Sequence, residues 1–283
     1  MVTIVCPEML PFVRRPGVRR MNRQPRYVDT HYLDTVQDRI RHDKRRSYEH
    51  MNLSTGGSVI EVGCGPGTDT VSLAELVGPN GRVVGVDIDP GMIREANERA
   101  RVGGVQDTVN HIEADASSLP FDDDDFDAAR SERLLQHLED PATALREMVR
   151  VTRARGRIVL MDMDWGSVSI DVPEVDVERR LIRYKADAMQ VNGYIGRQLN
   201  RLVREAGLID VQVEPRPIVS HDLAFIRFAL ALDEVESRAV DEGVVSLEEV
   251  ARWKEGLHAA DIAGTFFASG MMVIASGAKP VRA

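Results

Sequence analysis

The feature that most constrains the fold is a glycine-rich turn set between a short apolar run and a helical pattern. Residues 61–67 read Glu-Val-Gly-Cys-Gly-Pro-Gly, after the apolar run 58–60 and before the helical pattern 70–76. Glycine has no Cβ and adopts positive φ at little cost, so a ligand can approach the backbone of such a turn closely. The segment therefore predicts a strand, a ligand-binding turn and a helix in succession.

A second signal lies at the end of the next apolar run. Residues 82–86 are mostly apolar and end at Asp87, twenty residues past Gly67. An acidic side chain at the tip of the second strand is where a nucleoside ligand presents its ribose hydroxyls. The two segments predict a nucleoside-containing cofactor, held by Gly63, Gly65, Gly67 and Asp87.

The spacing of the glycines narrows the choice of cofactor. A dinucleotide fingerprint needs Gly-x-Gly-x-x-Gly, whereas the third glycine comes one residue early, at Gly67, and Thr68 takes the expected place. The Gly-Lys-Ser/Thr ending of a phosphate loop is also missing from this turn. Glu61 would repel a pyrophosphate in a partly buried site and suits a cationic ligand better. S-adenosylmethionine carries a sulfonium and an ammonium but no phosphate, so it fits the turn.

Segments 59–67 and 83–92 resemble the class I S-adenosylmethionine-dependent methyltransferases. Among these enzymes they look most like the small-molecule methyltransferases related to ubiquinone and menaquinone biosynthesis. Further similar segments follow in the order of the family, at 113–116 with 119–121, at 126–131, at 136–141 and at 155–160. The resemblance covers residues 57–165, a little over a third of the chain.

The resemblance implies a fold and additional cofactor residues. It implies an α/β fold with a doubly wound, seven-stranded, mostly parallel Rossmann-like sheet, whose last strand runs antiparallel beside the sixth. Ile88 and Met92 are implied as cofactor contacts beside Asp87. Asp115 and the backbone amide of Ala116 are implied at the adenine. Ser131, at the carboxyl end of the fourth strand, is expected to face the reactive methyl group, because ligands bind outside strand ends.

The periodicity of the chain gives the same fold class. Strands alternating with helices at these lengths are typical of a parallel, doubly wound sheet. The expected strands are 59–63, 82–87, 109–113, 126–131, 157–163, 209–214 and 271–276. The expected helices are 30–51, 68–77, 90–101, 141–153, 174–190 and 195–206, with two or more further helices within 222–260.

The chain is expected to divide into a core and a helical cap. Residues 1–52 form an N-terminal arm and helix, and 53–165 form the cofactor-binding core. Segments 166–192 and 222–262 are cap insertions, while 193–221 and 263–283 complete the sheet. Loops at strand ends usually carry specificity, so the cap is expected to choose the substrate. The N-terminal helix near Tyr32 and Tyr48 is expected to close the same pocket from the other side.

Composition is that of an ordinary globular protein, with 43% hydrophobic and 29% charged residues. No apolar run approaches the ~18 residues that span a membrane, and the start lacks the features of a signal peptide. Two cysteines, Cys6 and Cys64, cannot make a disulfide framework. These features predict a cytoplasmic protein without a membrane partner, and they leave a homodimer open.

Charge is distributed unevenly along the chain. The net charge is −9, yet six arginines crowd residues 14–26. This cluster has two interpretations, a nucleic-acid contact or a solvated arm that packs on an acidic body. A protein that follows phosphates usually has a basic body as well, so the acidic balance favours the solvated arm.

The catalytic residues are harder to assign. Methyl transfer is an in-line displacement that alignment accelerates, and a base is needed only if the acceptor loses a proton early. His137 is either that base or a structural hydrogen-bonding group. His221, followed by Asp222, is a second candidate base. Residues at or just past strand ends are candidates for the acceptor pocket: Arg130, Glu132, Arg133, Asp162, Asp164 and Trp165. The spacing of Glu132, Asp162 and Asp164 does not match a metal-dependent catechol-type enzyme, so no metal is expected.

Three functions remain open from the sequence. The first is methyl transfer to oxygen, nitrogen or carbon of a small molecule, such as a quinone precursor or a natural-product intermediate. The second is methylation of a nucleic acid or a protein. A DNA amino-methyltransferase would show Asn/Asp-Pro-Pro and an aromatic residue where 131–134 read Ser-Glu-Arg-Leu. The third is a cyclase that binds the cofactor without using its methyl group. The mass of the product separates the first function from the third.

Overall fold

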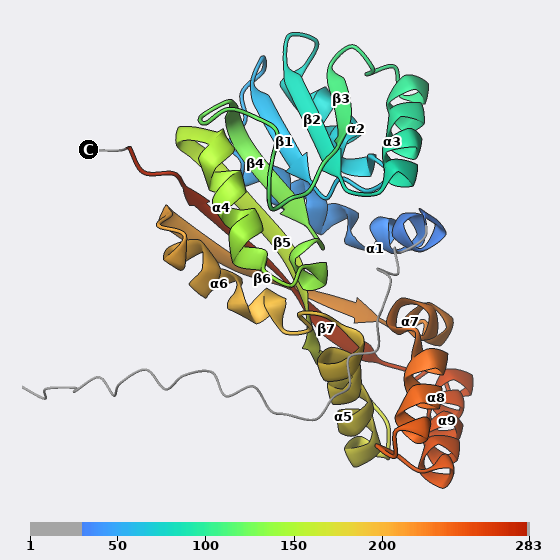
Figure 1. Cartoon of the computed structure of the whole chain (residues 1–283). Coiled ribbons are helices and arrows are strands. Elements are labelled where there is room, and N and C mark those ends of the chain that lie inside the picture. Colours follow the sequence, from blue (N-terminus) through green and yellow to red (C-terminus); the bar gives the residue numbers. More distant parts are fainter. Residues whose placement is uncertain (1–29, 282–283) are drawn as a thin grey trace, which may run out of the picture.

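The computed structural model describes residues 30–281 and forms one mixed sheet there (Figure 1). The seven strands in this range lie in the order β3-β2-β1-β4-β5-β7-β6. Neighbours from β3 to β5 are parallel, whereas β7 is antiparallel to both β5 and β6. This order confirms the predicted doubly wound sheet with one reversed strand. The strands are β1 (Ser58–Val62), β2 (Arg82–Asp87), β3 (Val109–Glu113), β4 (Phe126–Glu132), β5 (Thr152–Ile170), β6 (Ile209–Ser220) and β7 (Ala268–Ala278).

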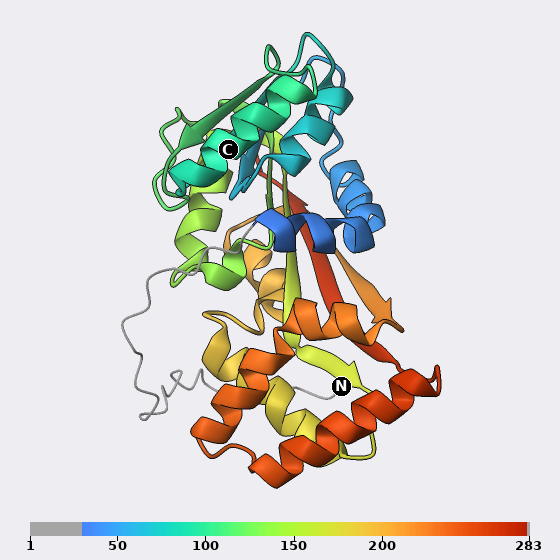
Figure 2. The same ribbon diagram turned by 90° about the vertical axis from the view of Figure 1, so that its right-hand side faces the viewer.

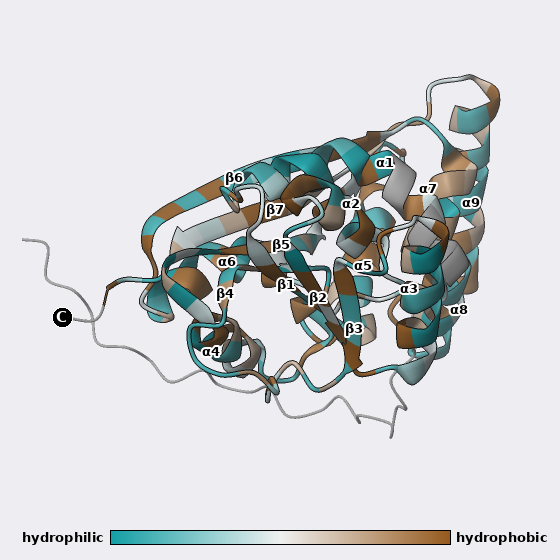
Figure 3. Ribbon diagram, turned by 90° about the horizontal axis from the view of Figure 1, so that it is seen from above, coloured by the Kyte–Doolittle hydropathy of each residue, from teal (hydrophilic) through white to brown (hydrophobic). Residues whose placement is uncertain are grey.

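Helices cover both faces of the sheet and bury its apolar side chains. One face packs against α1 (Thr30–Glu49), α2 (Thr68–Val77) and α3 (Pro90–Val102), and the other against α4 (Pro141–Val151) and α6 (Ile195–Glu205). Along β1, Val59 belongs to the first apolar core and Ile60 to the second, as expected for a strand that is buried on both sides. Apolar residues accordingly gather in the central strands (Figure 3).

Local signals explain where several helices begin. Asp89 accepts a hydrogen bond from the backbone N–H of Gly91, and Asp140 accepts one from Thr143, so each caps its helix. Proline follows each cap as the first helical residue, where its missing N–H is not needed. Both helices therefore begin at the carboxyl edge of the sheet, beside the turns that follow β2 and β4.

Three strands are longer than the sequence predicts. The predicted strand 157–163 is the middle of β5, 209–214 is the first half of β6, and 271–276 lies inside β7. Pro215 and Pro217 suggest a strand end, but β6 is an edge strand, where a residue without an N–H is tolerated. In β5 the register shifts between Asp164 and Ser169, and this irregularity hides the continuation. The expected core boundary after residue 165 therefore falls within a strand.

A cluster of helices lies at the far end of β5, β6 and β7 (Figure 1). They share a buried core that includes Leu181, Leu232, Val235, Trp253 and Leu257. The two predicted cap insertions thus come together as one helical cap. Its members are α5 (Val175–Tyr184), the π-helical turn η2 (Lys185–Met189), α7 (Leu223–Leu230), α8 (Leu232–Asp241) and α9 (Leu247–Ile262).

Helix α1 crosses between the core and the cap (Figure 2). Lys44 forms ion pairs with Asp69 of α2 and Glu132 of β4, both at 2.8 Å. Arg39 forms a more exposed ion pair with Asp222, at the start of α7. One helix therefore contacts both parts of the molecule. The Arg-rich segment 14–26 and the side chain of Tyr32 lie outside the described residues.

None of the helices within residues 30–281 is both long enough and apolar enough to cross a membrane.

Candidate cofactor and acceptor site

The glycine-rich turn folds over the end of β2. Gly63, Gly65 and Gly67 have φ of 74°, 50° and 75°, in the left-handed region that favours glycine. The N–H groups of Gly63 and Cys64 both donate to the carbonyl of Val86, at 2.7 and 2.9 Å. These bonds fix the turn against β2, one residue before Asp87.

Two of these glycines are required by the packing of the protein itself. A Cβ on Gly67 would lie 2.7 Å from the Cβ of Ala96 in α3, and one on Gly63 would lie 2.9 Å from a methyl group of Leu134. Carbon atoms in contact normally stay farther apart, so neither position has room for a side chain. From the sequence, a ligand contact was favoured over a mere turn for these glycines, and the structure shows that Gly67 and Gly63 also let α3 and the turn after β4 approach.

Asp87 lies beside this turn and is only partly used by the protein. Its two carboxylate oxygens accept the N–H groups of Gly65 and Asp89, each at 2.9 Å. A carboxylate has about four acceptor positions, so about two remain for other donors. Burial raises the pKa of Asp87, and the two N–H groups counteract part of that rise. The carboxylate is thus held in place by two hydrogen bonds and can still accept two more. Two ribose hydroxyls would need those two acceptor positions.

The next predicted contacts lie along the same edge. Ile88 keeps 53% of its surface exposed, which leaves a large apolar side chain uncovered next to Asp87. Met92 lies in the first turn of α3 and is half-buried. Together they offer an apolar surface of the kind on which a purine ring packs.

Asp115 and Ala116 follow β3 at the neighbouring strand end. Asp87 pairs in register with Glu113, so this turn lies beside Asp87. One oxygen of Asp115 accepts the N–H and the hydroxyl of Ser117, and these hydrogen bonds lower the pKa of Asp115. The N–H of Ala116 donates to no acceptor within residues 30–281. A carboxylate can accept a hydrogen bond from the amino group of an adenine, and the neighbouring unused N–H can donate one to a ring nitrogen.

A buried histidine supports the glycine turn from below. Nε2 of His111 lies 2.8 Å from the hydroxyl of Thr70, which itself lies 2.9 Å from the carbonyl of Gly67. Burial lowers the pKa of His111 to about 4, so the ring is neutral. Sequence reasoning missed this residue. The available signal was Gly85, its register partner in β2, where a Cβ would lie 2.6 Å from the ring.

Glu61 has a different role from the one expected. Its exposed fraction is 1%, and it forms an ion pair with Arg130, which is wholly buried. Burial raises the pKa of Glu61, and the Arg130 cation opposes that rise. A cation of the chain itself thus already pairs with one oxygen of Glu61, whereas Oε2 has no hydrogen-bond partner within residues 30–281.

The same buried cluster reaches α1 and α2. Arg130 donates from Nε to the hydroxyl of Ser47 at 2.9 Å, and Tyr48 donates its hydroxyl to Asp69. Burial alone would raise the pKa of Asp69, but Lys44 and Arg130 outweigh it and the pKa falls well below its usual range. Arg130 is thus a structural residue of this cluster rather than part of an open acceptor pocket.

Ser131 lies at the level of the glycine turn. Glu61 pairs in register with Arg130, so Ser131 is level with Val62, the last residue of β1. Its exposed fraction is 1%. The structure therefore brings Ser131, Asp87 and the glycine turn to one edge of the sheet.

The turn after β4, which contains η1 (Leu135–His137), is held by β5 and its continuation. Trp165 donates from its indole N–H to the side-chain oxygen of Gln136 at 2.5 Å. Asp162 accepts the backbone N–H groups of Met163 and Gln136, at 3.1 and 3.3 Å. Burial raises the pKa of Asp162 to about 7 despite these hydrogen bonds. Gln136 and Trp165 thus form a connected wall where the core meets the cap.

The two candidate bases lie in different places. His137 ends η1 and is exposed to solvent, with enough protein around it to lower its pKa to about 4 by desolvation and by the nearby Arg133. The positions of both can be compared along β7. His221 follows Ser220, the register partner of Ala268. Glu132, at the end of β4, is level with Ile274 through its register partner Met161 in β5. Six residues of β7 separate those levels, which is about 20 Å along a strand.

His221 and Asp222 also have separate partners. The ring nitrogen Nδ1 of His221 lies 3.1 Å from the carbonyl of Phe266. The Asp222 carboxylate accepts the N–H of Phe225 as the cap of α7 and pairs with Arg39. The structure therefore does not bring these two side chains together as a coupled pair.

The carboxylates near the strand ends form ion pairs or hydrogen bonds. Glu132 pairs with Lys44 and Arg133, and Asp164 pairs with Arg197 of α6 at 2.6 Å. Within residues 30–281, no three His, Cys, Asp or Glu side chains gather closely enough to hold a metal ion.

Comparison with known proteins is consistent with this geometry. A family model described as a methyltransferase domain matches residues 53–207. A 37.1 kDa protein in transposon TN4556 of Streptomyces fradiae is 37% identical over 258 residues, covering 88% of this chain and 71% of that protein. Methyltransferase GfsG of Streptomyces halstedii is 30% identical over 197 residues, covering 68% of each chain.

A shorter match covers the core. The ubiquinone/menaquinone biosynthesis C-methyltransferase UbiE of Pasteurella multocida is 34% identical over 119 residues, covering 42% of this chain and 44% of that enzyme. The chain thus aligns with less than half of that relative.

Solved structures share the fold. YcgJ of Bacillus subtilis has a TM-score of 0.61 at 20% identity, covering 86% of this chain and 100% of that chain. The [4+2]-cyclase SpnF has a TM-score of 0.53 at 19% identity, covering 92% of this chain and 86% of that chain. From the family model and the sequence relatives together, the chain belongs to the methyltransferase-domain family and is an S-adenosylmethionine-dependent methyltransferase.

Proposed function

We propose that this methyltransferase methylates an oxygen, nitrogen or carbon atom of a small molecule bound between the carboxyl edge of the sheet and the helical cap. One observation carries the proposal. β5 runs past the ends of β1, β2 and β4 into the cap, so the cap helices lie directly beyond the proposed cofactor edge (Figure 1). Ligands of open α/β sheets bind at that edge, and here the cap helices follow it along the chain direction of β5.

The residues at this edge fit S-adenosylmethionine. Asp87 has acceptor positions left for the ribose hydroxyls, and Ala116 has an unused N–H for the adenine. Ile88 and Met92 would pack on the adenine ring, and Asp115 would accept its amino group. The Gly63–Gly67 turn would hold the methionine part. When bound, the cofactor supplies a methyl group activated by its sulfonium.

The chain itself contributes alignment and exclusion of water. Ser131 lies at the level of the glycine turn and would face the methyl group. α1 and the cap would enclose the acceptor, which matters because a misaligned or hydrated site wastes the cofactor. The pKa of His137 is lowered to about 4, so its ring is neutral but a weak base, which would suit only an acceptor whose own proton is already acidic. His221 lies about 20 Å along β7 from the level of Glu132 and would contact a more distant part of the acceptor.

The names of the sequence relatives support a small acceptor. UbiE is named for C-methylation in ubiquinone and menaquinone biosynthesis, and two further relatives are named demethylmenaquinone methyltransferase. Their matches cover 42–53% of this chain. Since these matches leave about half of the chain uncovered, the identity of this chain's acceptor would depend on residues of its own cap. The net charge of −9 disfavours a nucleic-acid acceptor, since phosphate binding draws on basic surfaces.

A mass experiment tests the proposed function. The protein is incubated with S-adenosylmethionine carrying a trideuteromethyl group and with a cell extract that contains small molecules, protein and nucleic acid, and each fraction is searched for that label. The expected result is a labelled product that is lost in Asp87→Ala. A new product without the label would identify a cyclase instead, and label confined to added protein or nucleic acid would contradict the small-molecule assignment.

A further inference from the structure

Lys185 is a buried cation that has no anionic partner in the described part of the chain. It is the first residue of η2, and 4% of its surface is exposed. Within residues 30–281, its ammonium forms no ion pair and no hydrogen bond. Its one close partner is the ring of Trp165, whose centre lies 4.6 Å from Nζ. Buried lysines are nearly always paired, so this one calls for an explanation.

The surroundings of Lys185 disfavour its charge. Burial lowers the pKa of Lys185 to about 8, and the charge of Glu234 on α8 offsets part of that fall. Glu234 is itself engaged with Arg238 at 3.6 Å. An aromatic face attracts a cation but replaces only part of the hydration that burial removes. The buried ammonium therefore lacks a counter-charge that an anionic ligand could supply.

The backbone is distorted at the same residue. η2 continues α5 with the wider turns of a π-helix, a form that is rare and often found at functional sites. Tyr184, Lys185 and Ala186 are all buried. Three consecutive buried positions exceed the single apolar stripe of a regular helix, so the distortion turns Lys185 inward.

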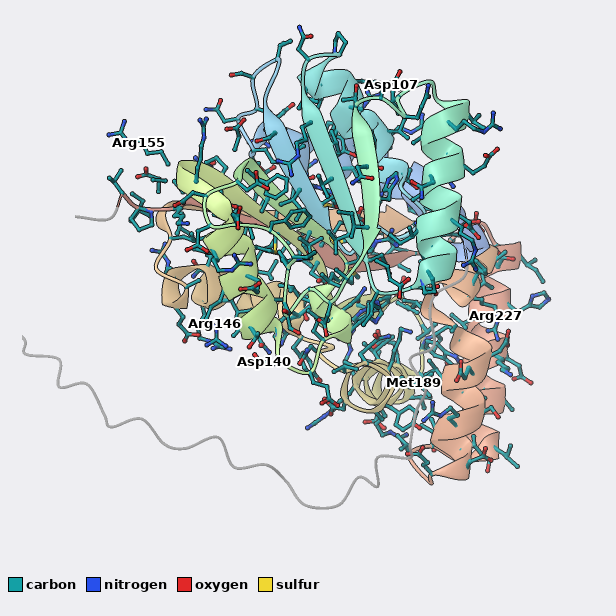
Figure 4. The ribbon with its side chains drawn as sticks, turned by 45° about the horizontal axis from the view of Figure 1, so that its top comes forward. Asp107, Asp140, Arg146, Arg155, Met189 and Arg227 are labelled. Atoms are coloured by element: carbon teal, nitrogen blue, oxygen red, sulfur yellow. The ribbon has the colours of Figure 1, made fainter. Side chains whose placement is uncertain are left out.

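Through Trp165, Lys185 is also connected to the turn that follows β4. Trp165, under the ammonium, donates to Gln136 in the turn that directly follows β4. The backbone N–H of Trp165 donates to Gly193, which fixes the ring between that turn and the cap. Met189, the last residue of η2, lies among the cap helices (Figure 4). The cation and the Trp165 ring therefore join η2 to the turn after β4.

We propose that Lys185 binds an anionic oxygen of the acceptor, a carboxylate or an ionised hydroxyl, and so selects acidic small molecules for methylation. The inference rests on the proposed function. Functional sites commonly retain such an unfavourable arrangement, because the ligand supplies the missing partner.

The test compares a charged and an uncharged probe on protein saturated with S-adenosylhomocysteine. Benzoate and its neutral isostere benzamide are titrated by calorimetry into wild type, Lys185→Met and Lys185→Arg. Lys254→Met is the matched control, since Lys254 is half-exposed on α9 and pairs with Glu236 at 3.0 Å. Wild type, Lys185→Arg and the control are expected to bind benzoate about tenfold more tightly than benzamide, and Lys185→Met equally weakly to both.

Two further readouts separate the explanations. Lys185→Met should unfold at a higher temperature than wild type, because it removes a buried unpaired charge. A purely structural lysine predicts the opposite. Benzoate should also change the tryptophan fluorescence of wild type but not of Trp165→Phe.

Several outcomes overturn the inference. These are equal binding of the two probes to wild type, no benzoate binding at about millimolar probe, or a preference that survives in Lys185→Met. If wild type fails to bind S-adenosylhomocysteine, the proposed function itself fails. Cofactor binding without a benzoate preference removes only the role of Lys185.

Discussion

Glu61 and Arg130 face each other across the adjacent parallel strands β1 and β4 and form an ion pair in the interior of the protein. The strand that carries Glu61 leads into the glycine turn, and the strand that carries Arg130 leads to Ser131. Arg130 also donates to Ser47 of α1. One buried pair therefore joins the two strands that flank the proposed methyl-transfer position and ties α1 to them.

Breaking the Glu61–Arg130 pair should lower the stability of the folded protein. Arg130→Met leaves the Glu61 carboxylate buried without a partner, which is expected to lower the free energy of unfolding by about 3–5 kcal/mol. Adding Glu61→Gln should recover part of that loss, because it removes the uncompensated charge. Urea unfolding of the single and double variants measures both effects. A single variant as stable as wild type would contradict the role of the pair.

Gly67→Ala should destabilise the protein through both backbone and packing. Gly104 serves as a matched control, since its φ of 68° is close to the 75° of Gly67 but nothing lies within 4 Å of an added Cβ. Gly104→Ala should cost about 1–2 kcal/mol for the left-handed backbone alone, and Gly67→Ala about 1–3 kcal/mol more for the clash with Ala96. Equal melting temperatures for the two variants would show that the clash relaxes freely.

Asp87→Ala should weaken the cofactor and its product alike. Loss of charged hydrogen bonds to the ribose is expected to cost about 2–3 kcal/mol in the affinity of S-adenosylmethionine. S-adenosylhomocysteine keeps the ribose and should weaken similarly. Asp107→Ala is the control, because Asp107 lies at the opposite end of the sheet (Figure 4). A calorimetric effect confined to the cationic cofactor would mean that Asp87 acts on the sulfonium charge.

His111 should make stability depend on pH. Burial lowers the pKa of His111 from 6.5 to about 4, so the unfolded chain binds a proton more readily than the folded protein. The stabilisation is complete above pH 6.5 and is lost as the pH falls toward 4, by up to about 3 kcal/mol. In His111→Gln this part of the pH dependence should disappear, while His42→Gln, at an exposed position, should keep it. Chemical unfolding at several pH values decides between them.

Removing α7–α9 should abolish turnover but retain the cofactor. Ser220 and Ala268 are register partners on adjacent antiparallel strands, so a two-residue Asn-Gly turn can join them as a hairpin. Val177 and Leu181 of α5 would lose their cover and should be replaced by Gln in the same variant. S-adenosylmethionine affinity is expected to stay within a few-fold of wild type. Methylation at the normal rate would show that the cap is only structural.

Local signals were sufficient to predict the core of the fold. The helix expected at 68–77 is α2, and the expected strand at 82–87 is β2, because turn residues and apolar periodicity mark their ends. The glycine turn and Asp87 do meet at one edge, since parallel strands end together. Their assignment as cofactor contacts stays a prediction.

Interactions between distant residues were not predictable in the same way. Arg130 is 69 residues from Glu61 in the chain, and neither residue type nor spacing indicates that they pair. The extension of β5 was missed because Gly166 and the serines after it weaken the strand pattern. Lys185 has no signal in the sequence either, since its burial depends on a π-helical turn and on Trp165.

The length of β5 has a consequence for how an acceptor enters. Because β5, β6 and β7 pass without interruption from the core into the cap, the two parts are joined by a continuous hydrogen-bonded ribbon and have no hinge between them. Core and cap should therefore move as a single body. Helix α1 reaches the cap through the half-exposed Arg39–Asp222 pair, which water can replace at little cost. We expect the opening of the Arg39–Asp222 contact, rather than a swinging cap, to set the rate of acceptor entry and product release.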